Sequence, residues 1–427
     1  MTAEDILNCS FKDRKKSHHD TGMGSMKYAK GMRSLEKALS EPNTQNGKKS
    51  VYIHVPYCKK ICSFCSMRRT INPVPDDYAD LVIRQIENYG KTEYVKSSNI
   101  NSVYFGGGTP TALPAKQLAE ILQALQKNFN IAKDAEISME TTVSELDDEK
   151  LKILFENGLN RISAGIQTFN DKGRKTLGRI GNGENAENFL RRAFKTGFKN
   201  VNIDIIYNYP DETKEILKED LRKAFALDVA GFSFYSLIVM DTSKIGRSVD
   251  KKEYAEKTLQ QDAEFFLTIL EDSRKAGYDF LEITKLVKPD RDNYEYIRSG
   301  HLGGDIFPVG AGAGGFVNNT AVMNPLDKEK FADQITGFDK TSGMWISEDY
   351  RRIKRFSGQL QEGLLDLSFL TKEESDKIYD MLTGLENETL IKKDSGSKNY
   401  KFTDKGFFWG NSLAAELGKS IFYYVQK

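Results

Sequence analysis

The stretch that decides the fold is residues 51–67, which read VYIHVPYCKKICSFCSM. It places Cys58, Cys62 and Cys65 within eight residues, while the one other cysteine of the chain is Cys9. An odd number of thiols this close in sequence does not form a disulfide framework. Soft thiolates are instead ligands for zinc, copper(I) or an iron–sulfur cluster. A closed zinc site or a 4Fe-4S cluster normally takes four ligands, so three cysteines predict a cluster with one open iron.

The spacing Cys-x3-Cys-x2-Cys, with Phe64 directly before the last cysteine, resembles the radical S-adenosylmethionine (SAM) superfamily. In that superfamily the open iron of a 4Fe-4S cluster chelates SAM, so the three cysteines would be the metal ligands. The preceding Tyr52-x-His54-x-Pro56 is similar to the coproporphyrinogen oxidase branch, the class C enzymes. A zinc knuckle with His54 as fourth ligand is the competing interpretation. A packed, hydrogen-bonded histidine on the first strand fits this position better than a ligand does.

Composition and charge exclude several classes of function. The chain has 427 residues, enough for two or three domains, and its formal net charge of +1 argues against nucleic acid as a partner. Apolar runs such as YSLIVM, residues 235–240, are too short to span a bilayer. The first twenty residues lack the apolar centre of a signal peptide, and no disulfide pattern is visible. A cytoplasmic location is therefore expected.

From residue 51 onward, short apolar runs alternate with helical patterns. Six runs rich in β-branched and aromatic residues predict strands, which begin near Val51, Ser102, Glu136, Arg161, Asn200 and Gly231. Several of the helical patterns between them end in a glycine at the expected C-cap position. Because strands that alternate with helices form parallel βαβ units, the sequence predicts an α/β fold with a partial, TIM-like (βα)6 barrel.

Changes in pattern divide the chain into four predicted parts. These are an N-terminal extension over 1–50, the partial barrel over 51–250, a helix and glycine-loop extension over 251–346, and a winged-helix-like domain over 347–427. The first part carries a helical pattern over roughly 26–39. The last part shows helices, a hairpin around Ser395-Gly396 and a closing helix. It is not especially basic, so a structural or lid role is expected rather than DNA binding.

Polar residues are predicted at the ends of the strands, where the sites of parallel α/β folds collect. The run Gly106-Gly107-Gly108-Thr109 ends the second strand, while Glu140, Gln167 and Asp204 lie on the next three, and Arg179 follows Gln167 by twelve residues. Taken singly, each has a structural alternative, a tight turn for the glycines or an ion pair for the charges. Because buried charges are costly unless they are paired or bound, the set together predicts a binding site.

The coproporphyrinogen oxidase branch binds two SAM molecules, and by this resemblance the positions fall into two sets. The cluster-bound SAM would be lined by Tyr52, Gly107, Glu140 and Gly314. The second SAM would be lined by Phe64, Gly108, Thr109, Gln167, Arg179 and Asp204. The resemblance assigns no catalytic side chain, because the cluster and SAM carry the chemistry.

Two further stretches are weaker signals. The run Gly310-x-Gly312-x-x-Gly315 matches a dinucleotide fingerprint, but no helical pattern follows it, so a nucleotide-binding fold is not expected. His301 lies in a segment with Tyr294 and Tyr296, and it is expected to be a solvated loop residue rather than a contact to substrate or iron.

Three kinds of relative within the branch are candidates for the activity of this chain. Coproporphyrinogen III oxidases usually carry a further cysteine where this chain has Met67, and heme chaperones carry histidines that are absent from residues 292–297 and 310–315. The heme-degrading methyltransferase family, anaerobilin synthase, resembles the chain in its Gly-Ala-Gly-Gly loop, in residues 291–296 and in the closing run 402–409. One departure from the branch is Asn208-Tyr209-Pro210 in place of Gly-Leu-Pro. The loss of that glycine is expected to reshape the second SAM pocket.

This resemblance implies a methyltransferase that opens heme without oxygen. One SAM would be cleaved to methionine and a 5'-deoxyadenosyl radical, which would take hydrogen from the methyl group of the second SAM. The resulting methylene radical would add to the porphyrin, and the macrocycle would open and release iron. The implied partners are heme or a related tetrapyrrole and a flavodoxin-type electron donor. The alternatives are decarboxylation of coproporphyrinogen III, methylation of another acceptor, and a heme chaperone without turnover.

Overall fold

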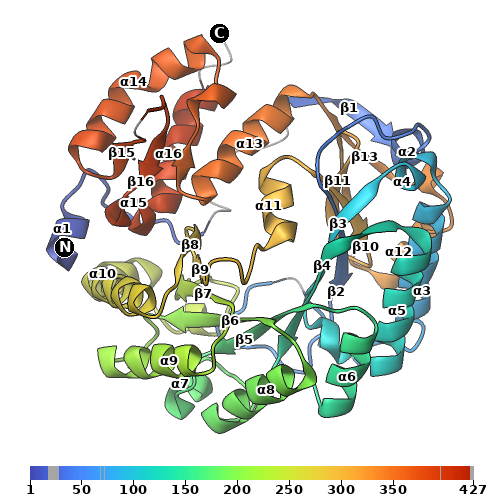
Figure 1. Cartoon of the computed structure of the whole chain (residues 1–427), viewed down its shortest axis with the longest axis horizontal. Helices are drawn as coiled ribbons and strands as arrows, with labels where there is room; N and C mark the ends of the chain where they lie inside the picture. Colours follow the sequence, from blue (N-terminus) through green and yellow to red (C-terminus); the bar gives the residue numbers. More distant parts are fainter. Residues whose placement is uncertain (18–27, 68, 72, 395, 424–427) are drawn as a thin grey trace.

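Six parallel strands form the centre of the computed structural model, which describes residues 1–17, 28–67, 69–71, 73–394 and 396–423 (Figure 1). The strands are β2 (Lys49–Val55), β3 (Asn99–Gly107), β4 (Asn130–Thr142), β5 (Arg161–Gln167), β6 (Asn200–Tyr207) and β7 (Gly231–Ser236). They pair in chain order, each parallel with the next. Strands of this kind are covered on both faces, and Tyr52 is the one partly exposed residue of β2. The predicted α/β fold is confirmed.

Helices cover the outer face of these strands (Figure 1). They are α3 (Tyr78–Gly90), α4 (Glu93–Lys96), α5 (Ala115–Asn128), α6 (Asp148–Glu156), α7 (Asp171–Thr176), α8 (Gly183–Thr196) and α9 (Lys214–Ala226). Their starts follow local chemistry, because the side chains of Asp147, Asn182 and Thr213 accept the first free backbone N–H groups of α6, α8 and α9. Gly197 ends α8 with φ +118°, a conformation that glycine adopts without strain.

The sheet continues beyond both ends of the parallel core. The added strands are β1 (Ala29–Ser34), β8 (Asp279–Glu282), β9 (Lys285–Val287), β10 (Asp305–Val309), β11 (Gly314–Val317), β12 (Thr320–Met323) and β13 (Ser342–Ile346). β10 pairs parallel with β2 and leads into antiparallel β11, β12, β13 and β1, while β9 and β8 form an antiparallel edge beside β7. Within the described residues the strand order stops at β1 and β8, so the barrel stays open. Helix α11 (Glu295–His301) lies between the two ends of the sheet (Figure 1).

The remaining connections are mostly helical. Helix α10 (Lys251–Lys275) agrees with the long helix expected after the barrel, and α12 (Lys328–Gln334) follows β12. In the part of the chain that the structure describes there are also the short 3₁₀ turns η3 (Pro110–Ala112), η4 (Ile245–Arg247), η5 (Phe338–Lys340) and η6 (Leu367–Phe369). A search of the described helices finds none with both the length and the apolar character needed to cross a membrane.

The helix expected over 26–39 is wrong for its larger part. Residues 26 and 27 lie outside the described residues, and the rest forms strand β1 followed by the short helix α2 (Leu35–Leu39). Gly31 has φ +131°, which a helix does not accommodate, and Met32 pairs with Met344 of β13. Pairing with a strand more than 300 residues away satisfies the backbone here, and the local sequence pattern contains no trace of it.

The C-terminal residues form a small separate sheet packed against helices. Its strands are β14 (Leu364–Leu365), β15 (Ile391–Lys393) and β16 (Tyr400–Phe402), and its helices are α13 (Asp349–Gln361), α14 (Lys372–Asn387), α15 (Asp404–Phe408) and α16 (Gly410–Tyr423). The antiparallel pair β15–β16 lies between α14 and α15, which is the helix, hairpin, helix order that the sequence pattern indicates. Its assignment as a winged-helix-like domain stays a prediction.

The first seventeen residues tie this C-terminal unit to the barrel. The Arg14 guanidinium donates to Asp262 of α10 at 2.6 Å and to the Phe408 carbonyl at 2.8 Å. Trp409 donates from Nε1 to the carbonyl of Ile6, in helix α1 (Ala3–Leu7), at 2.9 Å. Burial alone would raise the pKa of Asp262, but the charge of Arg14 holds it below its ordinary value. The N-terminal segment is thus an ordered strap between two parts of the fold.

A buried layer of charges lies at the start of β5. Arg161 donates to both carboxylate oxygens of Asp292, at 2.9 and 3.1 Å, and Lys285 lies 3.2 Å from the same carboxylate. The side chains of Arg161 and Asp292 have no exposed surface. Tyr294 covers the guanidinium of Arg161, with its ring centroid 4.4 Å away. Although burial would raise the pKa of Asp292, the two cations hold it well below its usual range.

Candidate active site at the open end of the barrel

The three cysteines lie on the loop between β2 and α3. The ends of this loop are held together, because Cys58 N donates to Thr70 O at 3.0 Å and Thr70 N donates to Pro56 O at 2.7 Å. Its middle is fixed where Ser63 N donates to Leu177 O at 3.0 Å. All three cysteine side chains are partly exposed. Within the described residues they do not stand close enough to form a ready-made group of three metal ligands.

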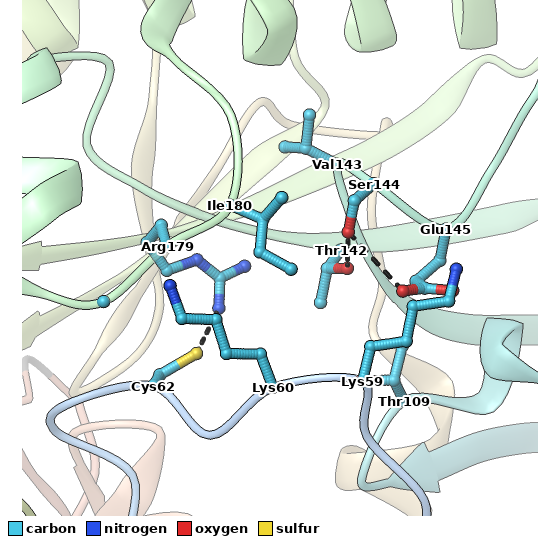
Figure 2. A pocket seen from close by; sticks show the side chains of 11 residues that line it. Lys59, Lys60, Cys62, Thr109, Thr142, Val143, Ser144, Glu145, Arg179 and Ile180 are labelled. Carbon is cyan, nitrogen blue, oxygen red and sulfur yellow. Dashed lines mark hydrogen bonds and ion pairs between the residues drawn. The ribbon is translucent and has the colours of Figure 1, made fainter. Parts of the chain in front are cut away.

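Two side chains from the loops that follow α7 and β3 contact these sulfur atoms. Arg179 donates from Nη1 to Cys62 Sγ at 2.9 Å (Figure 2), and its Nη2 donates to the carbonyl of Gly165 in β5. Thr109 Oγ1, just after β3, lies 3.4 Å from Cys58 Sγ. Burial raises the pKa of the Cys58 thiol, and the hydrogen bond with Thr109 partly offsets this effect. The structure therefore brings two predicted SAM-site residues directly against two predicted metal ligands.

A solvent-open pocket of about 350 Å³ lies beside this contact (Figure 2). Its lining comes from Lys59, Lys60 and Cys62 of the loop, from Thr109, and from residues 142–145 and 178–180. Lys59 and Glu145 form an ion pair across it, at 2.9 Å. Sequence reasoning missed both residues, because one acid and one base far apart in the chain carry no motif.

The glycines after β3 are explained by how closely the cysteine loop approaches them. A Cβ on Gly107, which has φ +111°, would lie 2.7 Å from the ring of His54. A Cβ on Gly108 would lie 2.7 Å from the carbonyl oxygen of Tyr57. Backbone N–H groups of Gly108 and Thr109 donate to Val55 and Tyr57, each at 2.8 Å. These glycines therefore dock the loop onto β3, whichever ligand they also contact.

Carboxylates from neighbouring strands face the interior of the barrel. Glu140 accepts a hydrogen bond from Tyr104 at 2.8 Å, and burial raises the pKa of Glu140 to about 7. Burial also raises the pKa of Asp204, although Lys285 and Ser233 partly offset the effect. Strand register supports their proximity, because β4, β5 and β6 are paired in order and Gly165 lies opposite Asp204.

Gln167 ends β5 in a strained conformation, with φ +69°. Its side chain is buried, and the register between β5 and β6 shifts at this point. Non-glycine residues rarely adopt such a φ, and they do so most often at functional sites. The predicted role of Gln167 gains support from this backbone geometry, which no sequence pattern indicated.

A stack of tyrosines extends from the first strand into the barrel. The rings of Tyr104 and Tyr296 are 4.5 Å apart and nearly parallel, and Tyr52 stacks on Tyr296 at 5.8 Å. Tyr52 is hydrogen-bonded to His54 Nδ1 at 2.8 Å, and burial lowers the pKa of His54 to about 4. His54 is therefore a neutral, packed residue of β2, as expected. Tyr235 on β7 is 38% exposed, and sequence reasoning did not single it out.

Asn208, which stands where the branch usually has glycine after β6, adopts φ +58°, because asparagine tolerates the left-handed region better than other side chains do. Tyr209 behind it is buried, within 3.3 Å of Thr168 Oγ1, and the expected reshaping of the second SAM pocket stays a prediction. One expectation about a loop needs correction, because His301 is not a loop residue. It ends α11, and its Nδ1 lies 3.6 Å from a carboxylate oxygen of Glu362.

The remaining predicted contacts are more dispersed. Phe64 packs against an apolar cluster that contains Leu177, Ile206 and Leu237. Gly314 begins β11, where a Cβ would lie 3.3 Å from the side chain of Met323. The glycine run before it forms a turn between two strands and opens no helix, so the dinucleotide fingerprint is coincidental.

Comparison with known proteins agrees with this geometry. The Radical SAM superfamily model matches residues 52–224. Anaerobilin synthase of Escherichia coli O157:H7 is 28% identical over 88% of this chain and 84% of its own length. Heme chaperone HemW of Lactococcus lactis is also 28% identical, over 88% of this chain and 97% of its own. Oxygen-independent coproporphyrinogen III oxidase of Salmonella typhimurium is 26% identical, over 69% of this chain and 67% of its own length.

A solved structure is similar across nearly the whole fold. Coproporphyrinogen III oxidase (HemN) from Escherichia coli, described as a radical SAM enzyme, superposes with a TM-score of 0.75 at 22% identity, covering 97% of this chain and 100% of that one. The three kinds of relative differ little in identity, so identity alone does not choose among their activities. Residues 52–224 therefore form a radical SAM domain, and the chain as a whole has a HemN-like fold.

Proposed function

We propose that this protein is a methyltransferase that uses two SAM molecules to methylate heme and open its macrocycle without oxygen, releasing the iron. The observation that carries the proposal is the contact of Arg179 with Cys62 and of Thr109 with Cys58. It supports two cofactor sites that share a border, because the sequence assigns these two residues to the second SAM and the cysteines to the cluster. The similarity to anaerobilin synthase over 88% of the chain supports heme as the acceptor.

The donor set suits a 4Fe-4S cluster held by Cys58, Cys62 and Cys65. Their loop is anchored at both ends, and the guanidinium of Arg179 beside Cys62 stabilises thiolate charge. When bound, the cluster would supply the electron that cleaves SAM reductively and yields a carbon radical. A flavodoxin-type protein is the proposed electron donor.

The chain's own residues would bind and orient the two SAM molecules. With its pKa near 7, Glu140 is poised to become fully charged beside a cation such as the SAM amino group. Tyr104 would hold that carboxylate in place through its hydrogen bond. Asp204 would act in the same way in the second site, since burial raises its pKa too. The tyrosine stack of residues 52, 104 and 296 would exclude water from the floor of the site.

Mass spectrometry of reaction products tests the proposal directly. The reconstituted protein would receive SAM and a reductant under nitrogen, with either heme or coproporphyrinogen III in parallel tubes. We expect a methylated, ring-opened tetrapyrrole from heme. Loss of two carboxyl groups from coproporphyrinogen would instead identify a biosynthetic oxidase. Cleavage of SAM without change in either tetrapyrrole would contradict both and leave another acceptor to be found.

A pair of substitutions separates the two SAM sites. Asp204→Ala is expected to slow methyl transfer by roughly tenfold to a hundredfold, the effect of losing one hydrogen bond to a charged group, while 5'-deoxyadenosine formation changes by less than about threefold. Glu140→Gln is expected to slow both reactions together, because it lies in the set assigned to the first SAM. The two products would be quantified from the same reaction. Equal losses of both products in the Asp204 variant would refute the two-site assignment.

A further inference from the structure

Lys354 is a cation without a partner on a helix whose other cations are paired. On α13, Arg351 donates to Asp305 at 2.7 Å and Arg352 donates to Glu374 at 2.7 Å. Lys354 makes neither a hydrogen bond nor an ion pair with any described residue. Its ammonium lies 5.1 Å from the centroid of the Phe316 ring, over which Arg351 also lies, at 5.0 Å.

The Lys354 side chain is partly buried where α13 packs over strand β11. Burial lowers the pKa of Lys354 to about 8, and the charge of Arg351 adds to this effect, while Asp305 partly offsets it. The side chain nevertheless keeps part of its surface accessible. A partly desolvated ammonium without an ion-pair partner is a group that the carboxylate of a ligand would stabilise. An unpaired charge there is costly to the folded protein.

Strand β11 links Lys354 to the proposed SAM site. Phe316, on which Lys354 rests, lies two residues after Gly314, which the sequence assigns to the cluster-bound SAM. Alternate residues of a strand point to the same face, so Gly314 and Phe316 share one face of β11. Lys354 therefore stands over the continuation of the surface that Gly314 begins.

We propose that Lys354 binds a carboxylate of the substrate, and the assignment rests on the proposed function, which makes the substrate a tetrapyrrole with propionate groups. A charge-assisted hydrogen bond from the ammonium to a propionate would supply the partner that the fold lacks. The carboxyl groups of Glu140 and Asp204 disfavour the same propionate on the barrel side. The substrate would thus bind with its propionate edge toward α13 and the opposite ring edge toward the SAM site.

The first readout is the stability of the ligand-free protein. In Lys354→Met a partly buried charge without an ion-pair partner is replaced by an apolar side chain of similar length, so the melting temperature is expected to rise by about 1 °C. A purely structural lysine would give a fall instead, and a fall would overturn the assignment.

The second readout is binding of heme and of heme dimethyl ester, whose propionates carry no charge, to the full-length reconstituted protein. The Lys354→Met variant is expected to bind heme about tenfold more weakly and the ester with unchanged affinity. The reason is that the propionates of heme carry the negative charge with which Lys354 would pair, whereas those of the ester are neutral. Lys354→Arg should retain most of the affinity for heme. Lys372→Met, which removes an exposed lysine at the start of α14, is the matched control and should alter neither affinity.

The outcomes distinguish this inference from the function on which it rests. If the unsubstituted protein binds the acid and the ester equally well, or if Lys354→Met weakens both alike, the carboxylate assignment falls and the proposed function stands. If the protein cleaves SAM but binds neither tetrapyrrole, both the proposed function and the assignment of Lys354 to a substrate carboxylate are refuted.

Discussion

A Cys62→Ala variant is expected to lose the iron–sulfur cluster and, with it, all cleavage of SAM. Three cysteines are already one ligand fewer than such a cluster normally takes, so the removal of one leaves too few thiolates to hold it. The same change also removes the sulfur to which Arg179 donates. Iron and sulfide content, the visible absorbance of the cluster, and the yield of 5'-deoxyadenosine would measure the loss, which should reach background in all three.

The matched control is Cys9→Ala. Cys9 is the remaining cysteine of the chain, lies buried near the N-terminus, and has its Sγ 3.9 Å from the carbonyl of Phe11. Its removal should leave cluster content and SAM cleavage unchanged. Formation of 5'-deoxyadenosine at the parent rate by the Cys62 variant would show that the triad is not the cluster site.

The second large effect is expected on stability. Asp292→Ala would leave Arg161 and Lys285 without their shared anion in a dry part of the barrel. Breaking a buried ion pair from one side costs about 3–5 kcal/mol, because the remaining charge is uncompensated. Thermal unfolding followed by circular dichroism should show a fall in melting temperature of about 3–6 °C.

Two further variants show whether the cost comes from charge and burial. Asp292→Asn keeps hydrogen-bonding atoms but loses the charge, so its melting temperature should lie between those of the parent and the alanine variant. Glu373→Ala removes an acid that is 79% exposed and paired with Lys377, and a surface pair of this kind contributes less than about 1 kcal/mol. A melting temperature for Asp292→Ala as high as that of Glu373→Ala would refute the account of the charged layer.

Local patterns were sufficient to predict the parallel core. The six strands follow runs of β-branched and aromatic residues, and their order in the sheet is their order in the chain. Such units form from neighbouring segments, so the pattern of each segment contains most of the information. The cysteine loop was predictable for the same reason, since Cys58, Cys62 and Cys65 lie within one short stretch.

Features that depend on distant partners were not predictable from one sequence. Strand β1 pairs with β13, and Tyr296 meets Tyr52 and Tyr104 only when α11 enters the open side of the barrel. Asn208 shows a different limit. Its left-handed backbone conformation, with φ +58°, could not be predicted from the sequence of the turn.

The strap formed by the first seventeen residues also bears on the order in which the protein is completed during synthesis. Ile6 leaves the ribosome well before its partner Trp409, which lies 403 positions later. The strands β2 to β7 pair with near neighbours and can associate while translation continues. The strap cannot close until Trp409 has emerged, so this contact forms after the parallel core has been synthesised.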